Sequence, residues 1–389
     1  MRIVMMLLLA VAAGCASSQP PLTALTKSSG APRAPEQAAV AFEAADLSLR
    51  VDPRARSIEG DAALTFRATE SVNRLAVDLD RNLRVRSVEV DGAAVATPDN
   101  AEGRLFIPLP KALAAGEATT VRIRYGGKPH VAKRAPWDGG FVWAKTPAGQ
   151  PWIATAVQGE GCDLFWPCID HPLAEPARMD LHITVPSPLV AAGNGVATGM
   201  EEKEGWRTYH WRTRNPNTYA IALNIAPYAV MTGTYESRFG NTIPLAFYYL
   251  PENEAKARGL FEEFPRMLDF FESTIGPYPF ADEKMGVAET PHLGMEHQTI
   301  NAYGNEYAKG PEGYDWLLQH EFAHEWFGNQ MTNTDWDDMW LHEGFGSYMG
   351  PLYARYLLGD RAYFAAMNRT RAGIRNKAPL VSGTSKTEE

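Results

Sequence analysis

Two histidines four residues apart, with a glutamate between them, constrain this chain more than any other feature. They are His320 and His324, and Glu321 directly follows the first. On a helix, residues i and i+4 lie one turn apart on the same face, so both imidazoles can point at one metal ion. Zinc held by two histidines and a carboxylate keeps a position for water and lowers the pKa of that water to about 7, and an adjacent glutamate can take its proton. The motif therefore predicts a helix that carries a zinc-hydrolase centre.

A second helix is expected to supply the third metal ligand. Glu343 follows His324 after an interval of 18 residues, in a segment from about Asp337 to Leu358 that we expect to be helical. The helix of the histidines should run from about Tyr314 to Gly328, and the two helices can pack across each other. The neighbouring His342 points about 100° away around the helix, so it is not expected to bind the metal. We predict one Zn²⁺ ion bound by His320, His324 and Glu343.

The hydrophobic pattern changes along the chain and divides it into two regions. Leu47, Leu49 and Val51 alternate with polar residues, and the same period of two returns at 121–125, 179–185 and 219–225. Short strands separated by Gly and Pro turns predict an antiparallel β domain over residues 40–230. After Pro251 the apolar residues recur at helical spacing, first from Leu260 to Ile275 with a kink at Pro265, and last at 361–376. Residues 231–389 are therefore expected to form a mainly helical zinc domain.

The first residues have the features of an export signal. An apolar run from Ile3 to Ala13 is too short to span a bilayer, and Ala12-Ala13-Gly14-Cys15 resembles a bacterial lipobox. We expect residues 1–15 to be a signal peptide and Cys15 to carry a lipid, with an ordinary cleaved signal as the alternative. The protein would then reach the bacterial cell envelope, either in the periplasm or held to a membrane. Residues 16–39, rich in Pro, Ser and Ala, would be a flexible linker.

The charge of the chain limits its possible partners, and its cysteines allow two states. The formal charge is −9 and no run of Lys or Arg exceeds two, which argues against nucleic acid as a partner because phosphate binding needs a basic face. Two cysteines remain besides Cys15. Cys162 and Cys168 either form a disulfide in an oxidising envelope or stay half-buried thiols, and the sequence favours neither.

The residues around the metal motif separate the classes of zinc hydrolase. The metzincin pattern needs Gly and His where this chain has Phe327 and Gln330, whereas thermolysin-like enzymes share the interval to the third ligand. The chain resembles the aminopeptidase N family of zinc metallopeptidases, family M1, which also includes the leukotriene-processing hydrolase. Its H-E-x-x-H-x-W-F-G-N pattern is similar to residues 320–329, and its W-L-N-E-G-F pattern to residues 340–345. Gly294-Met295-Glu296-His297 resembles the family's G-x-M-E-N signature, with His297 in place of Asn.

The resemblance implies a fold and a set of roles. It implies a multi-domain β plus α/β fold, in which a saddle-like N-terminal antiparallel β domain is followed by a partial, mainly helical thermolysin-like zinc catalytic domain. It also implies hydrolysis of peptides that have a free N-terminus. Glu321 would act as general base, and Glu296 would bind the α-amino group of the substrate. Gly294 and Met295 would lie along the peptide backbone, and Gln158, nine residues before Pro167, would line the pocket. Trp326, Phe327, Trp336 and Trp340 are expected to pack between the two metal-bearing helices.

One part of the family pattern is not found. A tyrosine that stabilises the oxyanion is expected about 60 residues after the third ligand, in a Y-x-K-G-like stretch, and that position lies past Glu389. We therefore expect a fragment that binds zinc but is a weak or inactive peptidase. Two other functions stay open: a non-catalytic peptide-binding lipoprotein of the envelope, and an epoxide hydrolase related to the leukotriene enzyme.

Overall fold

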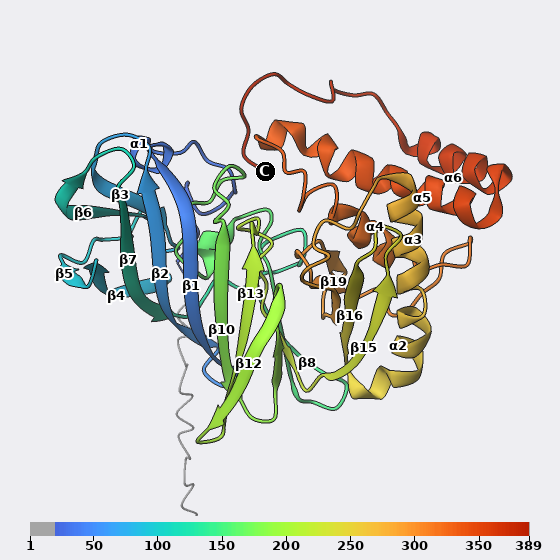
Figure 1. Ribbon diagram of the computed structural model, residues 1–389, viewed down its shortest axis with the longest axis horizontal. Coiled ribbons are helices and arrows are strands. Elements are labelled where there is room, and N and C mark those ends of the chain that lie inside the picture. Colours follow the sequence, from blue (N-terminus) through green and yellow to red (C-terminus); the bar gives the residue numbers. More distant parts are fainter. Residues whose placement is uncertain (1–19, 389) are drawn as a thin grey trace, which may run out of the picture.

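The computed structural model describes residues 20–388, which form a β-rich region followed by a region that holds most of the helices (Figure 1). The expected signal peptide, residues 1–15, and Cys15 lie outside the described residues. Within the described part, none of the helices combines the length and the apolar character that crossing a membrane requires.

An eight-stranded sheet organises the β-rich region. Its strand order is β12-β13-β10-β1-β2-β7-β4-β5. Along β1 the alternating residues Leu47, Leu49 and Val51 are buried, which confirms the expected period of two. The expected antiparallel pairing is found at the other strand pairs of this sheet, whereas β1 runs parallel to β10. The strands are β1 Val40–Asp52, β2 Ser57–Ala68, β4 Leu83–Val90, β5 Ala93–Val95, β7 Ala118–Gly127, β10 Arg178–Pro186, β12 Val196–Lys203 and β13 Trp206–Arg214.

Two smaller sheets complete this region. One pairs β3 Val72–Asp78 with β6 Arg104–Leu113, and the other has the order β11-β14-β9-β8. Only Asn224–Ala226 of the strand expected at 219–225 is a strand, β14. The residues before it bond to side chains instead, as when Ala222 N donates to Asn194 Oδ1. The remaining strands are β8 Gly140–Lys145, β9 Pro151–Ala156 and β11 Val190–Ala192.

The second region contains a five-stranded sheet, which fits the expected α/β class although the residue pattern did not locate its strands. Its order is β15-β16-β17-β19-β18, and α2 and α3 lie beside it in Figure 1. The helix expected from Leu260 is broken into α2 and α3, because Pro265 belongs to the first turn of a new helix, where proline is tolerated. The strands are β15 Ala229–Glu236, β16 Thr242–Tyr249, β17 Met285–Glu289, β18 Gly294–Met295 and β19 Asn301–Tyr303; the helices are α2 Glu254–Phe261, α3 Phe264–Thr274, α4 Trp316–His324, α5 Glu343–Leu358 and α6 Asp360–Gly373.

The segment before β1 is packed, so the expectation of a flexible linker is wrong for residues 20–39. It ends in a short helix, α1 Pro35–Ala38, and Thr26 and Ser29 are buried. Ser29 N donates to Gly159 O at 2.7 Å. A Cβ added to Gly30 would lie 2.2 Å from Trp336 Cδ1, so this backbone fits closely against the other region. Side chains that reach neighbouring segments, rather than composition alone, decide whether such a stretch is ordered.

The two regions are joined by buried polar contacts. Asn194 Nδ2 donates to Gln298 O at 2.7 Å, and Gly195 N donates to Thr299 Oγ1 at 2.7 Å. The Lys284 amine donates to Gly193 O at 3.0 Å, and its burial lowers its pKa to about 7. Because unpaired buried polar groups are costly, these bonds hold the two regions in one relative position.

Candidate metal centre and substrate pocket

Helix α4 carries the two histidines and is fixed at its start by a capping residue. The Asp315 side chain accepts a hydrogen bond from Leu318 N at 3.1 Å and another from the Tyr303 hydroxyl at 2.5 Å. Leu318 and Phe322 are buried in the core of this region. With that face buried, His320 and His324 lie together on the face that meets α5. The helix ends at His324, four residues before the expected end.

The three expected metal ligands converge. His320 Nε2 and His324 Nε2 are 3.1 Å apart, and the Glu343 carboxylate lies 3.4 Å from the first nitrogen and 3.7 Å from the second. Ligand atoms around tetrahedral zinc, with bonds of about 2.0–2.1 Å, are separated by about 3.3 Å. The donor set and its spacing therefore fit a zinc ion. His324 Nδ1 is 2.9 Å from Phe327 O, a contact that leaves Nε2 to face the metal position.

Close packing of α5 against α4 depends on a glycine. A Cβ on Gly346 would lie 2.9 Å from His324 Cε1 and 3.2 Å from His324 Nε2. No side chain fits there without moving the imidazole. Glu343, at the first position of α5, is thereby brought to the histidines. Burial raises the pKa of Glu343, but the hydrogen bond with His320 and the neighbouring imidazoles outweigh it and lower the pKa below its ordinary value.

Glu321 lies beside these ligands in a buried position. A Cβ on Gly294 would be 2.3 Å from Glu321 Oε1, so β18 passes directly over this carboxylate. Burial raises the pKa of Glu321 most, and the nearby Glu296 and Glu343 carboxylates raise it further. His320 lowers this pKa, but by less than the other causes raise it. A carboxyl group in such surroundings can both take and return a proton.

Glu296 is held by residues of both regions. Its Oε1 accepts a bond from Gln158 Nε2 at 2.5 Å and one from the Tyr219 hydroxyl at 2.8 Å. Asn329 Nδ2 donates to the Glu296 backbone carbonyl at 3.0 Å. Both side-chain donors bind Oε1, so the second oxygen is left for a further donor. The sequence had suggested Gln158, but it gave no signal for Tyr219, which lay in an expected strand.

A pocket of about 330 Å³ brings these groups together. It lies between the two regions, since loops of the β-rich region, strand β18, α4 and α5 all contribute to its walls. Every residue proposed for the site from the sequence lines it, except His324, which is buried behind His320. The lining residues are Pro136, Trp137, Gln158, Gly159, Leu293, Gly294, Met295, Glu296, Trp316, Leu317, His320, Glu321, Glu343 and Glu388.

Comparison with known proteins assigns the family. Residues 42–219 match the peptidase M1 N-terminal domain, and residues 261–379 match the peptidase family M1 domain. The chain belongs to peptidase family M1. This confirms the resemblance drawn from the motifs and the order of a β-rich region before a zinc-peptidase region.

Individual M1 proteins are similar over much of the chain. Leukotriene A-4 hydrolase of Xenopus laevis is 26% identical over 321 residues, which are 78% of this chain and 50% of that protein. Human aminopeptidase N is 26% identical over 220 residues, which are 52% of this chain and 22% of that protein. An M1 zinc metallopeptidase of Deinococcus radiodurans superposes with a TM-score of 0.73 at 28% identity and covers 88% of this chain and 77% of its own. The chain spans half or less of the length of these curated relatives.

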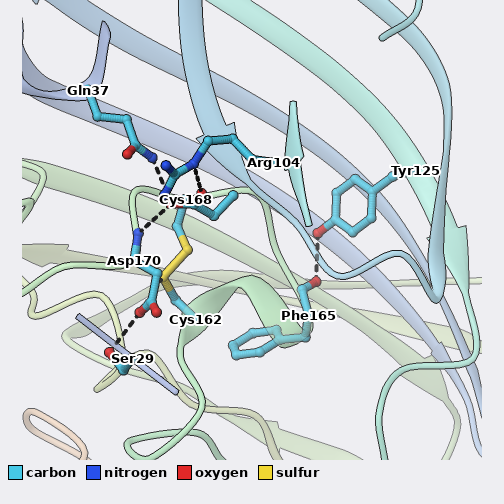
Figure 2. The surroundings of a disulfide bond; sticks show 9 residues. Ser29, Gln37, Arg104, Tyr125, Cys162, Phe165, Cys168 and Asp170 are labelled. Atoms are coloured by element: carbon cyan, nitrogen blue, oxygen red, sulfur yellow. Dashed lines mark hydrogen bonds and ion pairs between the residues drawn. A yellow bond between two sulfur atoms is a disulfide. The ribbon is translucent and has the colours of Figure 1, made fainter. Parts of the chain in front are cut away.

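A disulfide bond, one of the two states that the sequence allowed for its remaining cysteines, is present in the M1 chain. Cys162 and Cys168 are bonded, and both are fully buried, so the half-buried thiols are excluded (Figure 2). Beside it, Ser29 Oγ donates to Asp170 Oδ1 at 2.9 Å, and Arg104 Nε donates to Asp78 Oδ1 at 2.5 Å. The bridge closes the loop that follows Gln158 and stabilises one wall of the pocket.

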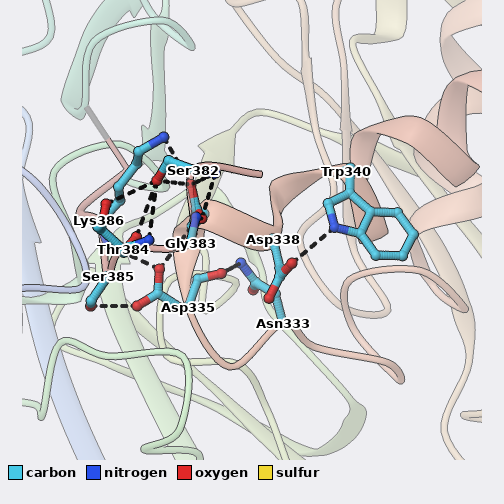
Figure 3. A network of polar contacts seen from close by, with 10 residues as sticks. Asn333, Asp335, Asp338, Trp340, Ser382, Gly383, Thr384, Ser385 and Lys386 are labelled. Atoms are coloured by element: carbon cyan, nitrogen blue, oxygen red, sulfur yellow. Dashed lines mark hydrogen bonds and ion pairs between the residues drawn. The ribbon is translucent and has the colours of Figure 1, made fainter. Parts of the chain in front are cut away.

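A segment after α6 reaches the same M1 pocket. Asp337 accepts bonds from Ser382 N and Gly383 N, each at 2.9 Å, and Lys386 N donates to Asp335 Oδ1 at 3.0 Å (Figure 3). Glu388 N then donates to Ser29 O at 3.0 Å, and the Glu388 side chain lines the pocket. Two aspartates of one turn thus direct residues 382–388 past the metal centre.

Several aromatic residues of the M1 region differ from expectation. Phe327 stacks on Phe345 of α5 as expected, whereas the buried Trp326 packs on Phe271 of α3 instead of between α4 and α5. Trp336 packs in the core of the β-rich region, with its ring 5.7 Å from that of Tyr219. Trp340 is 37% exposed, so its expected core position is wrong; its indole donates to Asp338 instead. Of the tyrosines after Glu343, none of those described lines the pocket; Tyr348 contacts Tyr363, and Tyr356 donates to Asp269.

Proposed function

We propose that this chain is a zinc-dependent aminopeptidase that binds one zinc ion and removes the first residue of peptides. One observation carries the proposal. Side-chain atoms of Glu296, Glu321 and His324 lie within 4.8 Å of one another, so the group suited to an ammonium ion adjoins the base and a metal ligand. A peptide whose α-amino group sits at Glu296 therefore has its first peptide bond, and no later one, at Glu321.

Each residue then has a defined task. His320, His324 and Glu343 would hold zinc, which when bound polarises the scissile carbonyl and supplies an activated water. Glu321 accepts the proton released as the water adds to the carbonyl, and it returns that proton to the departing amine. The Glu296 carboxylate accepts hydrogen bonds from the substrate ammonium, and Gln158 and Tyr219 keep it oriented.

Similar proteins support this proposal. A mutant of the Deinococcus radiodurans M1 zinc metallopeptidase is bound to a Tyr-Ser-Ala substrate in one structure, and a mutant of a two-domain M1 zinc metallopeptidase is bound to L-arginine in another. A tripeptide and a free amino acid share an α-ammonium group, which is the group that Glu296 is placed to bind. One relative is the leukotriene A-4 hydrolase of Xenopus laevis, so epoxide hydrolysis is the competing activity that the substrate assays must separate from peptide hydrolysis.

The test compares substrates and variants of the zinc-loaded chain. Hydrolysis of leucyl-p-nitroanilide is followed for hours at micromolar protein, so that slow release can also be measured. Wild type should release nitroaniline, Glu321→Gln should lose at least about 10²-fold of that rate while keeping one equivalent of zinc, and N-acetyl-leucyl-p-nitroanilide should be inert. Release that is equal in wild type and Glu321→Gln would reject the proposal, and zinc and peptide binding without hydrolysis would favour a non-catalytic binding protein.

We further propose that the protein is exported and that Cys15 is lipidated. The apolar run and the lipobox-like residues before Cys15 support this. Mass spectrometry of the mature N-terminus in a bacterial host should find a diacylglyceryl group on Cys15 that Cys15→Ser lacks. A mature N-terminus that begins at another residue without lipid would show an ordinary cleaved signal.

A further inference from the structure

Two exposed tryptophans line the pocket, Trp137 from a loop of the β-rich region and Trp316 from the start of α4. We propose that Trp137 and Trp316 form an apolar subsite for the side chain that follows the scissile bond, so that peptides with a large aliphatic or aromatic second residue are preferred. This inference rests on the proposed function, because it uses Glu296 to define where the first residue lies.

The pocket has one polar end and one apolar end. At the polar end, Gln158 and Tyr219 hold Glu296. Strand β18 leads from there back through Gly294 to Leu293, and α4 runs from Glu321 back to Leu317 and Trp316. The two elements stay in contact over this distance, since a Cβ on Gly294 would lie 2.8 Å from Leu317 Cδ1.

This direction orients a bound peptide. Its ammonium group lies at Glu296 and its first peptide bond lies at Glu321, so the rest of the chain continues toward Leu293, Trp316 and Leu317. These three side chains are apolar and line the pocket. The residue that directly follows the scissile bond therefore meets an apolar surface.

Both tryptophans are unusually open for apolar side chains in a pocket. Trp137 is 61% exposed and Trp316 is 45% exposed. An indole has a large apolar area, and covering it with another apolar side chain is favourable. One face of the Trp137 indole has the Arg134 guanidinium 5.8 Å from its centroid, and much of both indoles is still exposed, as is expected where a ligand covers them.

The loop that carries Trp137 has a fixed shape. The Asp138 carboxylate accepts bonds from Lys133 N at 2.9 Å and Arg134 N at 2.5 Å, and Trp137 N donates to Arg134 O at 3.1 Å. A Cβ on Gly139 would lie 2.1 Å from Glu160 Oε2, so the loop also fits closely against the segment after Gln158. The β-rich region thus presents Trp137 to the pocket from a preorganised turn.

The experiment uses Ala-Phe-amide and Ala-Ala-amide with the zinc-loaded chain. Amides are chosen because the pocket is lined by the carboxylates of Glu296, Glu321, Glu343 and Glu388, which disfavour a free peptide carboxylate. Wild type should cleave the phenylalanine peptide at least about tenfold better in kcat/KM, the difference that one large apolar contact typically gives. Trp316→Ala and Trp137→Ala should each reduce this ratio by at least about threefold.

Trp340→Ala is the matched control, because Trp340 is 37% exposed but does not line the pocket, and it should leave the ratio unchanged. A ratio that stays at the wild-type value in both pocket variants overturns the subsite. If wild type cleaves neither peptide, the proposed hydrolysis is wrong, and the same four proteins are compared by calorimetric binding of the two amides. If the two tryptophans form the subsite, wild type binds Ala-Phe-amide more tightly than Ala-Ala-amide, and this advantage falls in the two pocket variants. An advantage that is the same in wild type and in both pocket variants overturns the subsite.

Discussion

The hydroxyl of Tyr219 donates a hydrogen bond of 2.8 Å to Oε1 of Glu296. The two residues belong to different regions of the chain, and both are buried. Burial raises the pKa of Tyr219, and the Glu296 carboxylate raises it further, so the phenol keeps the proton that it donates. This bond orients the carboxylate that would bind the substrate ammonium, which makes Tyr219 a positioning residue.

We predict that Tyr219→Phe weakens substrate binding more than it slows turnover. Without the hydroxyl, Glu296 keeps only the bond from Gln158, and losing a hydrogen bond to a charged group costs about 1.5–3 kcal/mol. We expect KM for leucyl-p-nitroanilide to rise at least about tenfold, with kcat within about threefold and zinc content unchanged. Steady-state kinetics and metal analysis measure these quantities.

Tyr235→Phe is the control for this prediction. Tyr235 also donates to a buried glutamate, Glu272, but far from the pocket. The Tyr235→Phe substitution should lower the melting temperature of the protein without changing KM. An equal KM in wild type and Tyr219→Phe would show that the bond does not position Glu296.

We predict that Gly346→Ala lowers zinc affinity. The added methyl group would lie 2.9 Å from His324 Cε1 and would displace that imidazole from the metal position. Competition with a chromogenic chelator should show at least about a tenfold weaker zinc complex, the scale on which disturbed ligand orientation acts. Gly350→Ala in the same helix has only an ordinary contact, 3.5 Å from Gln319 Oε1, and should bind zinc like wild type. Equal affinities of the two variants would contradict the role of Gly346.

We predict a pH-dependent gain in stability for Asp163→Asn. Asp163 is fully buried, neither of its oxygens bonds to another residue of the described chain, and burial together with nearby Asp170 raises its pKa well above the ordinary value. The folded state therefore holds this proton at pH values where the unfolded state has lost it. The contribution of Asp163 to wild-type stability therefore falls as pH rises above about 4, the unfolded pKa, whereas asparagine does not titrate.

The measurement is the melting temperature at several pH values. Asp163→Asn should match wild type near pH 4 and melt roughly 2–4 °C higher at pH 8, a shift that corresponds to about 1 kcal/mol. Asp99→Asn, at an exposed position, should show no such trend. If the melting temperatures of wild type and Asp163→Asn differ by the same amount at pH 4 and at pH 8, Asp163 does not hold a proton in the folded protein.

We predict that Asp337→Ala releases the segment 382–386 from its position beside the pocket. Asp337 accepts bonds from Ser382 and Gly383 backbone amides and forms an ion pair with Lys386 at 2.8 Å. Hydrogen exchange of these amides should become at least about tenfold faster. Asp338→Ala removes only the bond from Trp340 and should leave their exchange unchanged. Unchanged exchange in Asp337→Ala would show that other contacts hold the segment.

The metal ligands were predictable because they lie in local helical patterns. His320, His324 and Glu343 converge as the spacing implied, and the alternation in β1 placed Leu47 and Leu49 in the core. The contacts that were missed join residues far apart in sequence. Tyr219 reaches Glu296 across 77 positions, and Trp336 leaves its own helical region for the core of the other. No periodicity encodes such contacts, because they depend on how the two regions pack.

The same separation explains the wrong expectation for residues 20–39. Their composition is that of a linker, but Ser29 bonds to Gly159 and to Asp170, more than 100 positions away. The five-stranded sheet was missed for a related reason. Its central strand β17, Met285–Glu289, is buried at every position, so it shows no alternation.

The buried bonds between Asn194 and Gln298 and between Lys284 and Gly193 also have a consequence for cleavage. The residues that would grip the end of a peptide come partly from one region, and the metal ligands come from the other. If the proposed cleavage takes place, the rigidity of the junction between the regions would set the number of residues removed per cycle. A peptidase assembled in this way would lose its accuracy of cutting position, and not only its rate, if that junction loosened.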